Sequence, residues 1–220
     1  MNLNFTTVKN IVLPEGPVKK ITSNGNTLWK AYDAEIEYIE STGTQYIRWE
    51  QIPFTRIRAI LECSYLSATG TQDTMMSFFR NQIYLGSSGG VYSRIGIWNT
   101  SSVSSGSGTL LSGYNLGSVF TIEIRVTNSN IVARSNNNPE QSFLRVISEN
   151  YIVLFCWANY NFKSKGRIYS FKLYDNTTPI MDLIPVRIGT TGYLYDKVQG
   201  KLYSNSGTGN FTLGPDLVVL

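Results

Sequence analysis

The run Phe120-Thr121-Ile122-Glu123-Ile124-Arg125-Val126 decides the fold class of this chain. Its even-numbered positions are apolar and its odd-numbered positions are polar, which is the period of a β-strand with one face on a core and the other toward solvent. Outward from it, residues 57–65 alternate in the same way, with Ile60 as the one exception. Residues 151–157 are continuously apolar, which predicts a strand covered on both faces. Helical periodicity is missing almost everywhere, so the sequence predicts an all-β protein.

Further strands are expected at residues 168–174 and 193–203, the latter broken by a turn around Asp196-Lys197 and Gln199-Gly200. Many short strands separated by turns rich in Gly, Asn and Ser favour a sandwich or a barrel. We interpret Ser87-Ser88-Gly89-Gly90 and the Ser- and Gly-rich residues 99–113 as surface loops. Such loops are either binding sites on a β scaffold or mere connections, and the sequence supports both interpretations equally.

A separate hairpin precedes the sandwich. Residues 18–23 and 26–30 flank Asn24-Gly25, a pair that supplies the two positive φ angles of a type I′ turn. A lone hairpin of this size is marginal in water, so it must pack on the sandwich, on another copy or on a partner protein. We therefore divide the chain into an N-terminal attachment segment, residues 1–32, and a sandwich, residues 33–220.

The composition excludes several classes of function. Histidine is absent, which removes every mechanism that uses imidazole as a base, a nucleophile or a metal ligand. The 19 basic and 15 acidic residues give a formal charge of +4, but the basic residues are spread along the chain, so no nucleic-acid partner is expected. Only 15% of the residues are charged, a proportion that suits extracellular or particle-bound β proteins. No cofactor is expected.

The two cysteines, Cys63 and Cys156, both lie in strand-like runs. Buried free thiols are the expected state of such positions, in preference to a disulfide between them. The first residues contain no apolar signal-peptide core, and no stretch approaches the length of a membrane span. We therefore expect neither export by a signal peptide nor membrane insertion.

Two parts of the chain resemble known phage proteins. Residues 13–16 (LPEG), 21–25 (ITSNG) and 28–30 (LWK) together resemble an N-terminal module of phage structural proteins. From residue 35 on, the chain is similar to the LamG-type, concanavalin-like domains of gut phages and prophages. The motifs that carry this likeness are residues 37–47 (EYIESTGTQYI), 166–175 (GRIYSFKLYD), 182–187 (DLIPVR), 194–203 (LYDKVQGKLY) and 207–211 (GTGNF). Where the family continues the first motif with an Asp-Thr-Gly turn, this chain has Arg48-Trp49-Glu50.

The resemblance implies a jelly-roll sandwich and a role on the virion as a head fibre, decoration protein or tail-associated adhesin. Other phage structural proteins would then be its partners, a host surface glycan its ligand, and a homo-oligomer, such as the trimer common among phage fibres, its assembled form. The residues expected to carry virion attachment are Leu13, Pro14, Ile21, Leu28 and Trp29. The alternatives are a carbohydrate-binding module with no particle and a purely structural capsid or tail subunit.

Exposed aromatic side chains are the candidate glycan site, because sugar rings stack on the faces of Trp and Tyr. Trp49, Tyr92, Trp98 and Tyr114 lie in or beside the loop-rich middle of the chain. Core packing or a subunit interface explains each of them equally well. The apolar C-terminal residues 217–220 are expected to form a docking strand or a contact between subunits, because a free apolar tail would promote aggregation.

Acidic residues offer two further candidates for chemistry. Glu35, Glu37 and Glu40 have a spacing that resembles the paired carboxylates of jelly-roll glycoside hydrolases, but the favoured interpretation is a solvated acidic edge strand, and no catalytic activity is expected. The aspartates that a calcium site would use do not cluster in sequence, and turn formation explains most of them better, so no metal site is expected. These aspartates are Asp73, Asp175, Asp182, Asp196 and Asp216.

Overall fold

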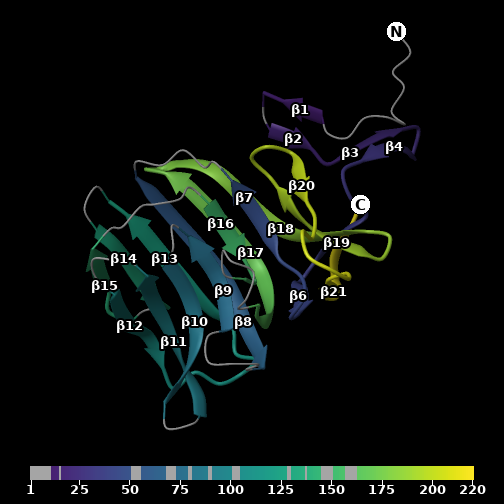
Figure 1. Ribbon diagram of the computed structural model, residues 1–220. Coiled ribbons are helices and arrows are strands. Elements are labelled where there is room, and N and C mark those ends of the chain that lie inside the picture. The colour runs from purple at the N-terminus through teal and green to yellow at the C-terminus, as the bar shows by residue number, and fades with distance from the viewer. Residues whose placement is uncertain are drawn as a thin grey trace.

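The computed structural model consists of β-strands joined by turns throughout the residues that it describes. These are residues 11–14, 16–50, 56–67, 73–78, 81–88, 91–100, 105–127, 130–136, 138–144, 151–156 and 163–220. Figure 1 shows two curved sheets packed face to face, with the N-terminal strands beside one end of the sandwich. No described segment is a helix long and apolar enough to cross a membrane. The prediction of an all-β jelly-roll sandwich is confirmed.

The smaller sheet has six antiparallel strands in the spatial order β12-β11-β10-β9-β16-β7. Their bounds are β7 (Ile47–Glu50), β9 (Asp73–Phe78), β10 (Asn81–Ser88), β11 (Val91–Thr100), β12 (Ser105–Ser112) and β16 (Tyr151–Leu154). Every residue of β16 is buried. Ile152 and Leu154 face the main core, whereas Tyr151 and Val153 join Cys156 in a small cluster on the other face. The expected coverage of both faces is thus confirmed for residues 151–156, and Trp157 lies outside the described residues.

The larger sheet follows the path β15-β14-β13-β8-β17-β18-β19-β20. Strands β5 and β6 add to β18 and β17, and β22 and β21 add in turn to β5 and β6. The bounds are β5 (Ala34–Ile36), β6 (Ile39–Thr42), β8 (Ile57–Ser67), β13 (Phe120–Val126), β14 (Asn130–Ser135), β15 (Gln141–Leu144), β17 (Lys165–Asp175), β18 (Thr178–Ile188), β19 (Thr191–Asp196), β20 (Lys201–Tyr203), β21 (Thr212–Leu213) and β22 (Asp216–Val219). In β13 the even-numbered residues are buried and the odd-numbered ones are not, as the alternation of this run predicts.

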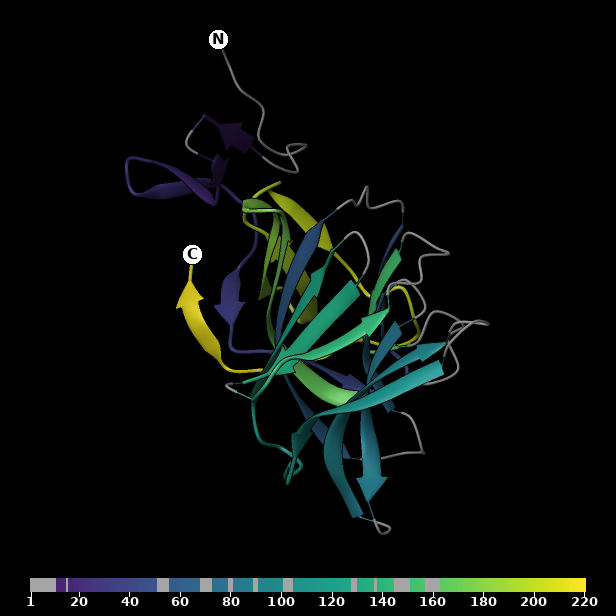
Figure 2. The same ribbon diagram turned by 90° about the vertical axis from the view of Figure 1, so that its left-hand side faces the viewer.

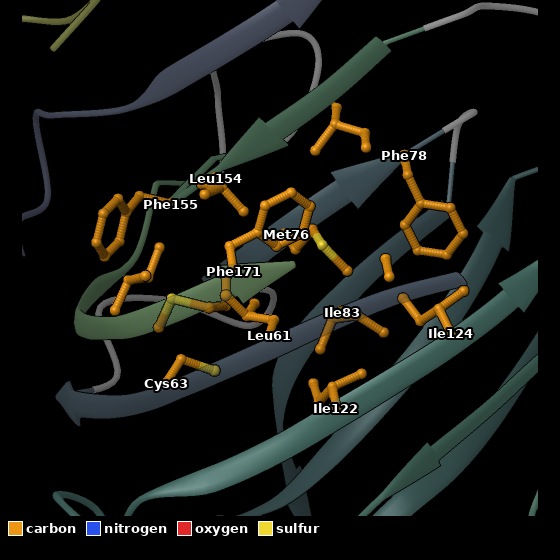
Figure 3. Packing of buried hydrophobic residues seen from close by; sticks show 14 of the residues in the cluster. Leu61, Cys63, Met76, Phe78, Ile83, Ile122, Ile124, Leu154, Phe155 and Phe171 are labelled. Carbon is orange, nitrogen blue, oxygen red and sulfur yellow. The ribbon is translucent and has the colours of Figure 1, made fainter. Parts of the chain in front are cut away.

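The main core lies between the two sheets. The larger sheet contributes inward-pointing side chains that meet those of the smaller sheet, as Figure 3 shows. Full burial of a Leu, Ile or Phe side chain contributes about 1.5–3 kcal/mol, so this core is the main source of stability. The labelled residues are Leu61, Cys63, Ile122, Ile124 and Phe171 from the larger sheet, and Met76, Phe78, Ile83, Leu154 and Phe155 from the smaller sheet and the turn after β16. Cys63 and Cys156 are buried free thiols, as expected.

The interpretation of residues 99–113 as a surface loop is wrong. Most of the segment is β12, which pairs with β11 from Arg94↔Ser112 to Thr100↔Ser105. Main-chain hydrogen bonds to a neighbouring strand form with any side chain except proline, so they override the weak strand propensity of Ser and Gly. Ser87 and Ser88 likewise belong to β10. Gly89, Gly90 and residues 101–104 lie outside the described residues.

The N-terminal segment forms two small hairpins, β1 (Ile11–Leu13) with β2 (Gly16–Val18), and β3 (Lys20–Ser23) with β4 (Asn26–Lys30). The predicted Asn24-Gly25 turn is confirmed, with φ angles of 50° and 79°. The segment packs on the sandwich of its own chain, which was one of the three expected packing partners beside another copy and a partner protein. The contact is a second apolar cluster, separate from the main core, formed by Trp29, Ala31, Tyr32, Val186 and Tyr195 and edged by Ile11, Val18, Ile21, Ile184, Tyr193, Leu202 and Leu220.

Candidate functional site

The structure places two of the four expected glycan-binding aromatics in the core, so they do not offer a stacking platform. Trp49 is 6% exposed and lies between Phe171 and Tyr203, with ring centroids 6.0 and 5.2 Å away. Tyr114 is 4% exposed, and its hydroxyl accepts the N–H of Tyr65 and donates to the carbonyl of Ser118. Both rings face inward because the strands or turns that carry them pack across the sandwich. The backbones of Tyr92 and Trp98 lie in β11, and their side chains are outside the described residues.

The three glutamates with hydrolase-like spacing are not brought together as a reactive pair. Glu35 accepts hydrogen bonds from Lys19 Nζ and Tyr32 Oη, both at 2.7 Å, and Glu40 pairs with Arg167 Nε at 2.8 Å. Burial raises the pKa of Glu35, but the hydrogen bonds from Lys19 and Tyr32 outweigh it and hold this pKa below its ordinary value. The expectation of an edge strand is wrong, because β5 pairs with both β18 and β22.

Two of the aspartates considered as calcium ligands, Asp182 and Asp196, are neighbours across β18 and β19. Among the described residues there is no group of three or more Asp, Glu, Cys or His side chains that could hold a metal ion. Asp196 illustrates the turn-forming role instead: its Oδ1 accepts the N–H of Asp182 at 3.1 Å and that of Val198 at 2.9 Å. Burial raises the pKa of Asp196 above its ordinary value. Its position therefore matches the turn expected at residues 196–200.

Exposed apolar side chains gather at one end of the molecule. Of the nine large hydrophobic side chains that are exposed in the described chain, six lie on the N-terminal hairpins, on β22 or at the last residue of β18. We name these six residues the apolar end: Leu13, Leu28, Ile188, Leu217, Val218 and Val219. Apolar patches on a soluble domain mark surfaces that contact other molecules.

Several contacts bring the segments of the apolar end together. Strand β22 pairs with β5, and Figure 2 shows it as the yellow arrow at the C-terminus, alongside the dark blue β5. The N–H of Leu220 donates to the carbonyl of Asp33 at 2.9 Å, and its side chain joins the second apolar cluster beside the N-terminal hairpins. Arg187 binds both carboxylate oxygens of Asp216, at 2.7 and 2.6 Å, which ties the end of β18 to β22. The C-terminal run is thus a docking strand, as expected.

The five residues expected to attach the protein divide into two groups. Leu13, Pro14 and Leu28 are exposed and available for contact with a partner. Ile21 is half-buried and Trp29 is 8% exposed, because both pack into the second apolar cluster. These last two side chains hold the N-terminal segment on its own sandwich, and attachment to a partner stays a prediction for all five residues.

A second surface feature is an open hollow of about 470 Å³ at one end of the larger sheet. It lies where β8 begins, β13 ends and the turn between β17 and β18 follows. Its lining consists of Arg56, Ile57, Arg58, Arg125, Val126, Thr127 and Asn176. We name it the arginine hollow.

The register of the sheet places like charges face to face in the arginine hollow. Arg58 and Arg125 are direct partners across β8 and β13. Like charges directly opposite one another destabilise a pair of strands unless anions compensate them. Arg58 Nε binds Glu123 at 2.6 Å, and Arg125 Nη2 binds Glu140. Each glutamate thus neutralises part of the charge, and Glu123 is also shared with Arg134.

Sequence reasoning missed the arginine hollow, because its arginines belong to runs far apart in the chain. The local signal is the pattern Arg56-Ile57-Arg58, in which two arginines lie on either side of a buried isoleucine. This pattern predicts an outward-facing cation, but it does not predict that Arg125 lies opposite. Only the pairing of β8 with β13 brings the three together.

Comparison with known proteins identifies the fold. The chain matches the native heptameric SAP-like pentraxin of Limulus polyphemus with a TM-score of 0.52 and 11% identity, over 84% of this chain and 96% of the pentraxin. Further matches are the exoplasmic/lumenal domain of VIP36 in its Ca2+/Man3GlcNAc-bound form (TM-score 0.38, 8% identity, 77% of this chain and 82% of that one) and the Ruminococcus gnavus IT-sialidase CBM40 bound to alpha2,3 sialyllactose (0.35, 12%, 77% and 90%). No family model and no curated protein matches the sequence. The chain therefore has a concanavalin-like, lectin-type jelly-roll fold.

Proposed function

We propose that this protein is a bacteriophage virion surface protein, attached to another phage structural protein through its apolar end, with a sandwich that binds glycans. The observation that carries the proposal is that six of the nine exposed large apolar side chains of the described chain lie on the N-terminal hairpins, at the end of β18 or on β22. A free domain would keep such a patch small, whereas a docked one buries it. The likeness of residues 13–30 to a module of phage structural proteins supports a phage partner.

The glycan-binding part of the proposal is supported by the fold and by the arginine hollow. Jelly-roll sandwiches of the lectin type occur among the glycan-bound neighbours, VIP36 and the CBM40. In this chain the hollow supplies an open surface depression lined by three arginines and by Asn176. The alternative is a carbohydrate-binding module that is not part of a virion. Such a module would need the same hollow but not the apolar end.

Contact between copies is part of the proposed assembly. Among the described strands, β22 has a neighbour, β5, on one side only, so its other edge can pair with a further strand. A homo-oligomer, with a trimer as the expected form, would bury that edge together with Leu217 and Val219. The purely structural subunit, in contrast, would assemble in the same way but bind no glycan.

The test is incorporation into particles of the phage that encodes the protein. The double variant Leu217→Asp, Val219→Asp adds two charges to side chains that are 64% and 69% exposed, so the fold should survive while docking is lost. Incorporation should fall at least tenfold, measured by mass spectrometry of purified particles, and light scattering should report a smaller oligomer.

A matched control is the pair Leu116→Asp, Val119→Asp, at two exposed apolar residues outside the apolar end. This variant should enter particles like the unmodified chain. Absence of the unmodified chain from particles would overturn the virion role and favour the free carbohydrate-binding module. Normal incorporation of the Leu217, Val219 variant would mean that the apolar end is not the attachment surface.

A further inference from the structure

Among the described residues, one cation in the arginine hollow has no ion-pair partner. Arg58 and Arg125 each bind a glutamate, whereas Arg56 has no carboxylate partner within the described chain. Arg56 is exposed in the bend before β8, and its carbonyl accepts the N–H of Asn176 at 3.0 Å. Asp175, the last residue of β17, lies opposite Ile57 across the sheet, and among the described residues no ion pair joins it to Arg56. The backbone of Arg56 is therefore held in place while its guanidinium stays open to solvent.

The arginines of the hollow present more donors than their glutamates use. A guanidinium carries five N–H donors in a rigid plane, and the hydrogen bonds to the two glutamates engage only one nitrogen each of Arg58 and Arg125. Planar forks of this kind match a carboxylate in two parallel hydrogen bonds. A ligand carboxylate would also relieve the repulsion between Arg58 and Arg125, which face one another across β8 and β13.

The shape of the hollow favours a saccharide over a polymer with a charged backbone. A volume of about 470 Å³ lies in the range of small-ligand sites and suits one or two sugar rings. The exposed Asn176 amide can hydrogen-bond a ring hydroxyl, whereas Ile57 and Val126, 6% and 4% exposed, belong to the main core and only form the floor of the hollow. A nucleic acid would need a continuous basic track, and Glu123 and Glu140 interrupt the positive charge beside the hollow.

We propose that the arginine hollow binds the carboxylate of an acidic saccharide, with Arg56 as the principal partner and Arg58 and Arg125 as its support. This inference rests on the glycan-binding role proposed above and names the ligand class of that role. The recognised group is the carboxylate of a uronic or nonulosonic acid, held by guanidinium hydrogen bonds, with Asn176 contacting a hydroxyl.

The test is calorimetric titration of the full chain with N-acetylneuraminic acid and with glucuronic acid. The methyl ester of each sugar serves as the uncharged counterpart, and inorganic sulfate as the anion without a ring. At least one of the two acidic sugars should bind, and its ester should bind at least tenfold more weakly. A higher salt concentration should lower the affinity for the acidic sugar. Arg56→Gln should lower the affinity for the acid about tenfold or more, because it removes a charge-assisted pair.

Lys165→Gln is the matched control, because Lys165 is an exposed cation at the opposite end of β17, about 30 Å from the turn that contains Asn176. It should leave the affinity unchanged. Equal losses in the two variants, equal affinity for acid and ester, or sulfate binding as tight as the acids would each overturn the inference. A glycan array distinguishes failure of this inference from failure of the proposed function. If the unmodified chain and Arg56→Gln bind neutral glycans equally, the arginine hollow is not the binding site, but the proposed glycan binding stands. Binding of no glycan at all, with normal entry into particles, would remove the glycan role itself.

Discussion

Single residues on the outer face of the larger sheet are organised by charge. Glu123 lies directly opposite Arg134 across β13 and β14 and accepts its Nε hydrogen bond at 3.0 Å. It also accepts the bond from Arg58 on the other side. Burial raises the pKa of Glu123, but the hydrogen bonds from Arg134 and Arg58 outweigh this effect and hold its pKa below the ordinary value. The carboxylate thus stabilises three neighbouring strands.

Glu123→Gln should make the free energy of unfolding less dependent on pH in acid. The pKa of Glu123 is lower in the folded state than the value of about 4.3 in the unfolded chain. The stabilisation is therefore complete above the unfolded value and is lost as the pH falls through the folded one. The variant cannot show this loss, and at neutral pH it should be less stable by about 1 kcal/mol. Urea unfolding at a series of pH values measures both effects, and identical pH slopes in the two proteins would contradict the prediction.

At the scale of elements, the β3–β4 hairpin has one face for its own sandwich and another for solvent. Trp29 is 8% exposed and Leu28, the next residue, is 46% exposed, because successive side chains of a strand point to opposite faces. The Trp29 side chain belongs to the cluster in which the rings of Tyr32 and Tyr195 meet edge to face, 4.9 Å apart. The hairpin is therefore held by one face and leaves Leu28 for a partner.

Trp29→Ala should release the hairpin from the sandwich. Removal of a buried Trp costs about 3–5 kcal/mol, which exceeds what a marginal hairpin can lose. Hydrogen exchange of the β3 and β4 amides should accelerate at least a hundredfold, while the strands of the main core keep their protection. Leu28→Ala is the control and should leave exchange unchanged, since its side chain is 46% exposed and lies outside the second apolar cluster. Equal acceleration in both variants would show that the second apolar cluster does not hold the hairpin.

At the scale of the whole molecule, the two thiols are buried on opposite faces of the smaller sheet, Cys63 in the main core and Cys156 in the small cluster with Tyr151 and Val153. Cys63 lies in the larger sheet and Cys156 follows β16 in the smaller one, and each has no exposed surface. Burial raises the pKa of the Cys63 thiol well above its ordinary value, which further disfavours the reactive thiolate. Cys63 becomes accessible when the packing of the two sheets is broken, and Cys156 when its small cluster on the other face of the smaller sheet opens.

Thiol modification should therefore report on opening of the sandwich. In native buffer at neutral pH, neither cysteine should react with an aromatic disulfide reagent on the time scale of free cysteine. Both should react in denaturant, at concentrations that match the unfolding curve from tryptophan fluorescence. Rapid reaction of one thiol in native buffer would contradict the burial of that residue, and oxidation to an internal disulfide would contradict the free state of both.

The sequence by itself determined the strands whose signal is local. The alternation of residues 120–126 is a property of seven consecutive side chains, and the Asn24-Gly25 turn depends on two, so neither needs a distant partner to be recognised. The motifs from residue 37 onward were sufficient to predict the jelly-roll fold, because they resemble strands of one fold family. The free, buried thiols followed from the apolar runs around them.

Tertiary structure alone decided the rest, because pairing between remote strands sets which faces and charges meet. Residues 105–112 form a strand through their bonds to β11, although Ser and Gly give no local signal for it. Trp49 and Tyr114 became core residues through the packing of one sheet on the other, which no local pattern distinguishes from exposure on a loop. The register of β8 with β13 brought Arg58 and Arg125 face to face, and so created the arginine hollow from residues far apart in the chain.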